Sequence, residues 1–284
     1  MGKNEVQIRV LGDLAIVRNG RSVPLPASKK TRALLGYLVA TGQPHLRERL
    51  CELLWDGPDD PRAALRWSLS KLRPLVAEAN LQADRERVAF DPAGVDVDLT
   101  MLRAAVPSAS SELPLAVLRA AAERCAGELL DGLDLPDCFR FHAWCTAERE
   151  AVRSLRVQLL ASLVARVAAS APDEALKWAR ARLAVDPLSD AAHASVVRCL
   201  GALGRTRDAI AHYDEARRLL AAELGARPIA LLERARDELS QLAAPPPVAD
   251  APMAAARHDA PRSARPLVGR RRERALVATL VAAT

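Results

Sequence analysis

Basic residues recur at helical spacing between positions 62 and 73. The polar side chains that share this spacing are Arg62, Arg66, Ser70 and Arg73. At about 100° per residue they fall within about 80° of one another, and no acidic residue interrupts the segment 62–77. Guanidinium groups in such a row can pair with the O6 and N7 atoms of guanine or with phosphates. An ordinary amphipathic helix with a solvated basic face has the same pattern, so neighbouring elements must decide between the two.

The same segment carries a narrow apolar stripe that would hold the helix to a domain. Its members are Leu65, Leu69, Leu72 and Val76. Asp60 is expected to cap the helix, with Pro61 as its first residue. Pro74 is expected to end or kink the helix after Arg73. The base-reading end is therefore expected at the N-terminal part.

Individual roles on this helix follow from residue chemistry. Arg62 and Arg66 are the best candidates for contacts to base edges. Ser70, Lys71 and Arg73 would position the phosphate backbone. Trp67 could stack on a sugar or pack under a neighbouring hairpin, and packing is the favoured interpretation.

Three further basic residues could reach DNA from outside this helix. Arg85 and Arg87 alternate in a second hairpin and could contact phosphates or the minor groove, although a solvated turn explains them nearly as well. Lys30, with Lys29, begins an earlier helix where phosphates bind amides, but ordinary surface lysines are slightly favoured there.

Other clusters of reactive side chains predict core or loop roles. Cys138, His142 and Cys145 share one helical face, but a structural zinc ion would need a fourth ligand. The nearby Phe139, Phe141 and Trp144 indicate a core-facing stretch in which thiols act as small apolar groups. No Ser, His and Asp arrangement suggests nucleophilic catalysis. We expect no catalytic site, cofactor or bound metal ion.

Short strands and helices would position the basic helix. Strands are predicted at 6–10 and 14–18, with Asn19-Gly20 forming a type I′ turn into a third strand. Helices are predicted at 28–41 and 46–55, and a hairpin at 81–90. The second helix is expected to bury Leu46, Leu50, Leu53 and Leu54. A small sheet, three helices and a hairpin, in this order, are typical of a winged helix-turn-helix.

A helical region follows, from about 99 to 242. Its segments 173–176 and 207–210 align at an offset of 34 residues, which matches Ala175 with Ala209 and is the tetratricopeptide period. Asp186-Pro187 is expected to end the leading helix of the first pair. The predicted fold class is therefore mainly α, with a small N-terminal β-sheet and winged helix-turn-helix before an all-helical, tetratricopeptide-like domain.

Net charge is weak support for nucleic-acid binding because of where it lies. The 284 residues carry a formal charge of +6. Residues 1–100 contain 15 basic and 13 acidic residues, and residues 101–244 contain 19 of each. Residues 245–284 contain 7 basic and 3 acidic residues, so most of the excess lies in a tail rich in Pro and Ala. The tail is expected to begin as a linker.

The ordered motifs resemble those of a known family. In the N-terminal part they are Lys30-Thr-Arg-Ala-Leu-Leu35, Leu46-Arg-Glu-Arg-Leu50, Leu53-Leu-Trp55, Ala64-Leu-Arg66 and Leu69-Ser-Lys-Leu-Arg73. These resemble the OmpR-type winged-helix domain of the Streptomyces antibiotic regulatory protein (SARP) family. In the second part they are Gly127-Glu-Leu-Leu130, Trp144, Glu148-Arg149-Glu150, Asp186-Pro187 and Glu223-Leu-Gly-Ala-Arg-Pro228. These resemble that family's bacterial transcriptional activation domain.

The resemblance implies a transcriptional activator that binds direct repeats in promoter DNA and contacts RNA polymerase. It further implies that the helical domain regulates and supports a homodimer, with protomers arranged head to tail on direct repeats. The segment Leu267-Val-Gly-Arg270 with Glu273 resembles the opening of an AAA-type ATPase domain. The chain is therefore expected to be the N-terminal part of a longer regulator. It has no G-x-x-x-x-G-K-[ST] phosphate loop and should not bind nucleotide unaided.

The expected domains are a winged-helix domain (1–98), a helical activation domain (99–242), a linker (243–264) and a truncated AAA-like domain (265–284). No signal peptide or membrane-spanning stretch is evident, and five cysteines without C-x-x-C pairs favour a reducing cytoplasm. Two alternatives remain open at this point. One is a helical protein-interaction scaffold whose basic helix is incidental, and the other is the N-terminal module of an ATP-dependent signalling switch.

Overall fold

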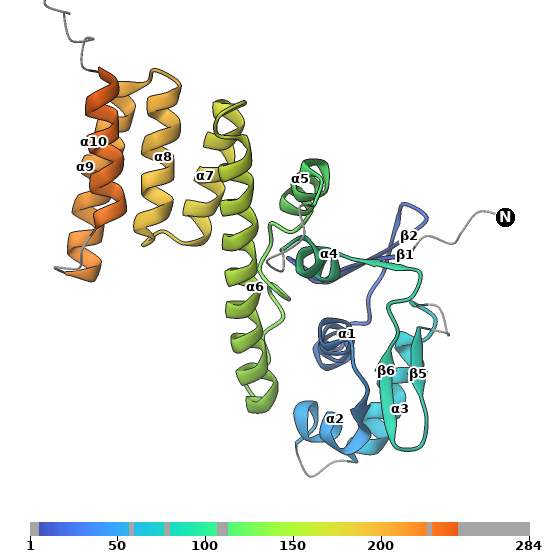
Figure 1. Ribbon diagram of the computed structural model, residues 1–284. Coiled ribbons are helices and arrows are strands. Elements are labelled where there is room, and N and C mark those ends of the chain that lie inside the picture. Colours follow the sequence, from blue (N-terminus) through green and yellow to red (C-terminus); the bar gives the residue numbers. More distant parts are fainter. Residues whose placement is uncertain (1–5, 57–59, 77–79, 107–112, 226–228, 244–284) are drawn as a thin grey trace, which may run out of the picture. The chain divides into compact units, whose positions relative to one another are not determined.

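The computed structural model shows a small set of strands and helices in the N-terminal part, followed by a row of helices (Figure 1). Most of the N-terminal elements begin or end at a capping or turn residue. The structure describes residues 6–56, 60–76, 80–106, 113–225 and 229–243. The chain divides into the compact units Met1–Ala244 and Pro245–Thr284, and the second lies outside the described residues. The predicted linker from 244 onward and the predicted AAA-like segment therefore lie outside them too.

The N-terminal strands form a four-stranded sheet in the order β3-β2-β1-β7. These strands are β1 (Val6–Arg9), β2 (Ala15–Arg18), β3 (Arg21–Val23) and β7 (Val95–Val97). β1 pairs antiparallel with β2 and parallel with β7. Asn19 and Gly20 have φ values of 50° and 76°, so both central residues of the β2–β3 turn are left-handed, as predicted for a type I′ hairpin. The strand β7 was not predicted.

Three helices and a second sheet follow. They are α1 (Lys29–Thr41), β4 (His45–Leu46), α2 (Arg47–Leu54), α3 (Pro61–Leu72), β5 (Leu81–Ala83) and β6 (Arg87–Phe90). Ser28 caps α1 by accepting a hydrogen bond from the Thr31 amide, and Gly42 ends it with a φ of 61°. The second sheet has the order β4-β6-β5, and its β5–β6 pair is the predicted hairpin. Leu46 lies in β4 and is 44% exposed, so its predicted burial was wrong.

The rest of the described chain is mostly helical. Its helices are α4 (Asp98–Ala105), α5 (Leu115–Arg124), α6 (Phe139–Val167), α7 (Pro172–Val185), α8 (Asp190–Ala202), α9 (Thr206–Leu224) and α10 (Ala230–Ala243). α7 packs on α6 and α8, and α8 packs on α9 and α10. Ala175 and Ala209, matched by the 34-residue offset, are both fully buried in α7 and α9. No helix in the described ranges is long and apolar enough to cross a membrane.

One stretch of the second half is extended where a helix was expected. The backbone of Leu129 forms an antiparallel bridge with Leu11, and Asp131 forms a parallel bridge with Asp13. The Gly12 amide donates to the Glu128 carbonyl at 2.6 Å. The prediction that 99–242 is wholly helical was wrong here, because this segment pairs with residues more than a hundred positions earlier.

The arginine of the Glu148-Arg149-Glu150 motif fixes that extended segment to α6. Arg149 donates from Nε to the Leu129 carbonyl at 2.9 Å and from Nη2 to the Leu130 carbonyl at 3.0 Å. The Gly127-Glu-Leu-Leu130 motif thus has a structural role, because it joins the helical second half of the chain to the N-terminal half.

Further contacts connect the two halves around α1 and α2. Arg140 on α6 pairs with Glu52 on α2 at 3.0 Å, and the Cys138 thiol donates to the Leu54 carbonyl at 3.4 Å. Arg103 on α4 donates to the carbonyl of Ala40, near the end of α1. The compact unit Met1–Ala244 therefore includes both of the predicted folded domains.

An ion pair between α5 and α7 makes part of the stability depend on pH. Glu174 accepts two hydrogen bonds of 2.6 Å from Arg119 and one of 3.0 Å from Trp178 Nε1. These bonds to Arg119 and Trp178 lower the pKa of Glu174 from 4.5 to about 2. A carboxyl whose pKa is depressed by folding stabilises the protein above its unfolded pKa. That contribution is lost as the pH falls towards the folded pKa.

We therefore expect Glu174→Gln to be less stable than the wild type at neutral pH. The difference in free energy of unfolding should shrink as the pH falls from 4.5 to about 2. Urea denaturation followed by circular dichroism at several pH values measures it. Glu123→Gln, which removes the exposed partner of Lys177, is the control for loss of a surface carboxylate. A difference that stays constant over this pH range would contradict the prediction.

Candidate nucleic-acid interface

The helix α3 has the caps and the two faces that its sequence predicts. Asp60 accepts hydrogen bonds of 3.0 Å from the amides of Arg62 and Ala63. The helix ends at Leu72, one residue before the predicted end and two before Pro74. The apolar stripe Leu65, Leu69, Leu72 and Val76 is buried.

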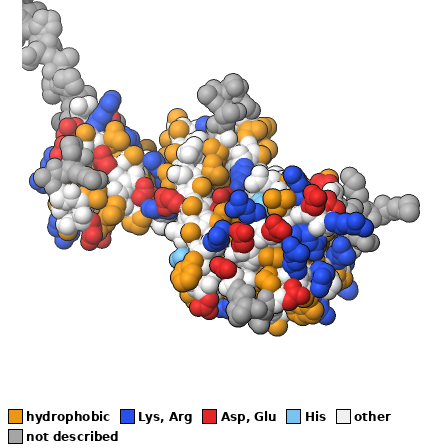
Figure 2. Space-filling model, turned by 90° about the horizontal axis from the view of Figure 1, so that it is seen from below, with side chains coloured by type: hydrophobic (Ala, Val, Ile, Leu, Met, Phe, Trp, Pro, Cys, Tyr) orange, Lys and Arg blue, Asp and Glu red, His pale blue; other side chains and the backbone are white. Residues whose placement is uncertain are grey.

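All the basic residues predicted on α3 face solvent. Those exposed are Arg62, Arg66, Lys71 and Arg73, together with Ser70. Within the described ranges, Arg66 makes no ion pair, so its guanidinium is available to a ligand. Blue Lys and Arg side chains gather on the N-terminal half of the molecule, with red acidic side chains among them (Figure 2). The surface therefore carries both positive and negative charges, and the role of each arginine depends on its position.

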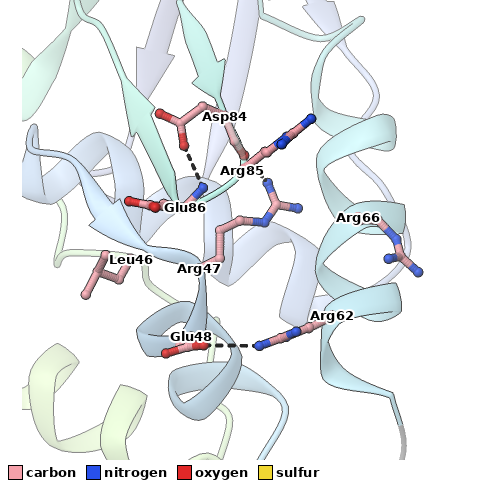
Figure 3. Close-up of a pocket in the computed structure, with 8 residues that line it drawn as sticks. All are labelled: Leu46, Arg47, Glu48, Arg62, Arg66, Asp84, Arg85 and Glu86. Carbon is pink, nitrogen blue, oxygen red and sulfur yellow. Dashed lines mark hydrogen bonds and ion pairs between the residues drawn. The ribbon is translucent and has the colours of Figure 1, made fainter.

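An open cleft of about 620 Å³ separates α3 from the β5–β6 turn and the start of α2 (Figure 3). Its lining residues are Leu46, Arg47, Glu48, Arg62, Arg66, Asp84, Arg85 and Glu86. Three elements distant in sequence thus present four arginines to one cleft. A cleft between a helix and a hairpin, lined by guanidinium groups, suits a phosphate backbone.

Arg47 ties the β5–β6 turn to α2. Its Nη1 donates to the Asp84 carbonyl at 3.0 Å, and its own amide donates to the Glu86 carbonyl at 2.8 Å. The Asp84 carboxylate accepts from the amides of Arg87 and Glu86, both at 2.7 Å. These two backbone hydrogen bonds hold the pKa of Asp84 below its usual value. The turn that carries Arg85 is therefore fixed in conformation.

Arg62 is held differently. Its Nη2 lies 3.1 Å from Glu48 Oε1, and the two side chains are about three-quarters exposed. An exposed pair of this kind contributes little stability and exchanges easily, since water screens both charges. Arg62 can therefore leave Glu48 for a phosphate or a base without a large cost.

The structure corrects the prediction for Trp67 and shows where the basic residues outside α3 lie. Trp67 is 51% exposed, so the favoured interpretation that it packs under the hairpin was wrong. Arg85 and Arg87 are exposed on the hairpin, with Arg85 in the cleft. Lys30 does not line the cleft. Its charge acts on Cys138 near α6, where burial raises the pKa of the thiol and Lys30 partly offsets this.

The cysteine and histidine trio is divided between core and surface. Cys138 and Cys145 are buried, and His142 is exposed. In the part of the chain that the structure describes, no three His, Cys, Asp or Glu side chains lie close enough to hold a metal ion. Phe141 is buried as expected, but Phe139 at the start of α6 is 81% exposed, so its predicted core role was wrong.

Arg47 and Glu48 are cleft residues that sequence reasoning missed. The segment Leu46-Arg-Glu-Arg-Leu50 was interpreted as the start of an amphipathic helix with Leu46 buried. In the structure β4 ends at Leu46, which places Arg47 beside the hairpin. No local pattern in residues 41–50 marks this short strand, because its pairing with β6 depends on residues about 40 positions later.

Known proteins resemble this chain in sequence over its second half and in fold over most of its length. The family model "Bacterial transcriptional activator domain" matches residues 97–240. The chain is similar in fold to EmbR of Mycobacterium tuberculosis, solved in complex with a low affinity phosphopeptide, with a TM-score of 0.61 and 21% identity. The alignment covers 84% of this chain and 65% of the EmbR chain.

No curated protein matches the chain. The family match covers the helices α4 to α10 and includes the Gly127-Glu-Leu-Leu130 segment that joins them to the N-terminal half. Since that match spans half of the residues, the assignment does not depend on the more distant likeness in fold. The chain belongs to the bacterial transcriptional activator domain family.

Proposed function

We propose that this chain is a sequence-specific, DNA-binding transcriptional activator of the bacterial cytoplasm. The observation that carries the proposal is the exposed basic face of α3. It lies beside a buried stripe and next to a hairpin fixed by hydrogen bonds, in a chain that continues into an activator domain. In this assignment α3 is the recognition helix of a winged helix-turn-helix domain, and β5–β6 is its wing. The proposal includes no catalytic step.

Each basic residue has a role in this proposal that follows from its placement. Arg66 is free of ion pairs among the described residues and reads a base edge in the major groove. Arg62 exchanges Glu48 for DNA, and Arg73 with Lys71 contacts phosphates. Arg85, at the fixed turn of the wing, reaches the adjacent backbone.

The activator half supplies the remaining partners in the proposal. We infer that its helices contact RNA polymerase and support a head-to-tail homodimer on direct repeats. Half-sites read from one face of the duplex would then recur at about 10 to 10.5 base pairs. The α7–α10 helices resemble tetratricopeptide pairs, with small residues at the matched positions Ala175 and Ala209.

Titration of DNA at several salt concentrations tests the proposal. A preferred duplex is first selected from a random library with the full chain, and its affinity is compared with that of random duplex. We expect log K to fall linearly with log salt, with a slope of about −0.9 per phosphate contact. On the selected duplex Arg66→Ala should lose about 1 to 3 kcal/mol, whereas on random duplex its loss should be smaller.

Arg217→Ala is the matched control, because Arg217 is an exposed arginine on α9, away from the cleft. It should bind both duplexes like the wild type. Equal losses by Arg66→Ala on selected and random DNA would remove Arg66 from base reading. Failure of the wild type to bind either duplex in a salt-dependent way would overturn the proposed function.

A further inference from the structure

Trp67 is the most exposed of the four tryptophans, although tryptophan is a side chain that burial strongly favours. Its side chain is 51% exposed, whereas Trp178 is buried and Trp55 and Trp144 are partly buried. Burial of a large aromatic side chain is favourable, and about half of the Trp67 surface has no such burial in the free protein. An exposed indole on a basic helix face indicates a surface that is completed by a ligand.

The position of Trp67 on α3 is more outward than that of the arginines. The buried residues Leu65, Leu69 and Leu72 define the inward direction of α3. At 100° per residue, Trp67 points within about 20° of the opposite, outward direction. By the same geometry Arg66 lies about 90° from that outward direction, and Arg62 about 130°. This agrees with the ion pair that Arg62 makes sideways with Glu48. Trp67 therefore points more directly away from the buried face of α3 than Arg62 or Arg66 does.

The side chains next to Trp67 on α3 leave much of its ring exposed and place one ammonium group over it. Ala63, one turn earlier on the same ridge, is too small to cover the ring. Lys71, one turn later, places its ammonium 5.5 Å from the ring centroid. The hydroxyl of Ser70 donates to the Trp67 carbonyl at 2.7 Å, so it turns towards the backbone of α3.

The part of DNA that such a side chain fits is apolar. On the floor of the major groove the C5 methyl of thymine is the apolar group, while the other base edges present hydrogen-bond donors and acceptors. An indole can cover that methyl, and the ammonium of Lys71, which lies over the ring in the free protein, can contact a phosphate. A ribose ring lies at the groove wall, to the side of the outward direction in which Trp67 points.

We propose that Trp67 determines specificity by contacting the C5 methyl of a thymine in the major groove. This inference rests on the proposed function, because it requires α3 to occupy that groove. It adds a base preference, thymine, that the arginines do not supply, since their paired hydrogen bonds favour guanine. It also accounts for an exposed apolar side chain in the middle of a polar helix face.

A deoxyuridine scan tests this contact, because the replacement removes only the methyl group. In the selected duplex each thymine is replaced in turn by deoxyuridine, which lacks only the C5 methyl. For the wild type we expect one position in each half-site at which replacement weakens binding about three- to tenfold. For Trp67→Ala we expect lower affinity for the thymine duplex and no further loss at that position. Trp67→Phe should keep part of the methyl dependence.

Tryptophan fluorescence gives a second readout on the same complexes. The selected duplex should quench the wild-type emission, and Trp67→Phe should lose this quenching. Phe139→Ala, which removes an exposed aromatic from α6, is the control and should retain wild-type affinity, methyl dependence and quenching. Thermal unfolding should show little change in Phe139→Ala and Trp67→Phe, because Phe139 is largely exposed and phenylalanine can keep the buried part of the Trp67 contact.

The outcomes separate this inference from the proposed function. If the wild type selects no sequence and binds no DNA, both fail. If Arg66→Ala loses specific affinity but the deoxyuridine penalty is the same in wild type and Trp67→Ala, only the thymine contact is overturned. The same conclusion follows if no thymine position shows a methyl penalty with the wild type.

Discussion

Gly127→Ala is expected to destabilise the folded chain by about 3 kcal/mol, the upper end of the usual cost of an overpacked site. A Cβ atom at this position would lie 2.4 Å from the amide nitrogen of Gly12 and 2.5 Å from its Cα. Both are backbone atoms, so relief requires the extended segment or the chain after β1 to move. That movement would also break the hydrogen bond of 2.6 Å from the Gly12 amide to Glu128. The small residue is therefore needed where the two halves meet.

Chemical denaturation of the full chain measures this effect. Gly42→Ala is the matched control, because Gly42 has a φ of 61° and open space around its Cα. That variant should lose only the cost of a left-handed alanine, about 1 kcal/mol. Limited proteolysis should cut Gly127→Ala faster than the control between its two halves. Equal stability of the two variants would show that the Gly12–Gly127 approach relaxes freely.

Asp98→Ala is the second change with a large expected effect, again about 3 kcal/mol or more. The Asp98 side chain is 2% exposed and follows directly on β7. Its carboxylate accepts hydrogen bonds of 3.0 Å from the amides of Val10 and Leu11 and one of 2.7 Å from Leu99. Alanine would leave buried amides without partners, and each such loss is costly.

The conservative variant distinguishes hydrogen bonding from charge. Burial raises the pKa of Asp98, and the backbone hydrogen bonds offset part of that rise. Asp98→Asn keeps one acceptor oxygen and removes the buried charge, so its loss should be smaller than that of Asp98→Ala. Asp96→Asn, at the partly exposed partner of Arg124, is the control and should change stability by less than about 1 kcal/mol. Urea denaturation at neutral pH compares the three variants, and equal losses for Asp98→Ala and Asp96→Asn would contradict the prediction.

Sequence reasoning succeeded where a local signal determines the structure. Ser28 and Gly42 bound α1, Asp60 begins α3, and Asn19-Gly20 makes the hairpin turn, each through hydrogen bonds or backbone angles within a few residues. The buried stripe of α3 follows directly from its 3.6-residue period. The mainly helical fold with a small N-terminal sheet was therefore predictable.

The errors share a different cause. Leu46 and Phe139 are apolar residues at the ends of helices, where periodicity does not say whether another element covers them. The strand β7 and the extended segment at 129–131 exist because of partners about 90 to 120 residues away. Such pairing leaves little trace in a local window.

The candidate site was predictable only where its residues lie on one helix. Arg62, Arg66, Ser70 and Arg73 share one helix, so their common exposure followed from spacing. Arg47 joins them only because the two-residue strand β4 pairs with β6, and Trp67 was misjudged because a hairpin beside α3 need not cover it. The roles of these residues on DNA stay predictions.

The bridges between residues 11–13 and 129–131 have a mechanical consequence. The two halves are joined covalently between β7 and α4. They are joined non-covalently at these bridges and, on another side, by the Arg140–Glu52 pair and the Arg103–Ala40 hydrogen bond. A body attached at one point can swivel about it, whereas attachment at two separated points removes that freedom. A torque on the helices of the second half would therefore turn the whole N-terminal half, α3 included, as one body.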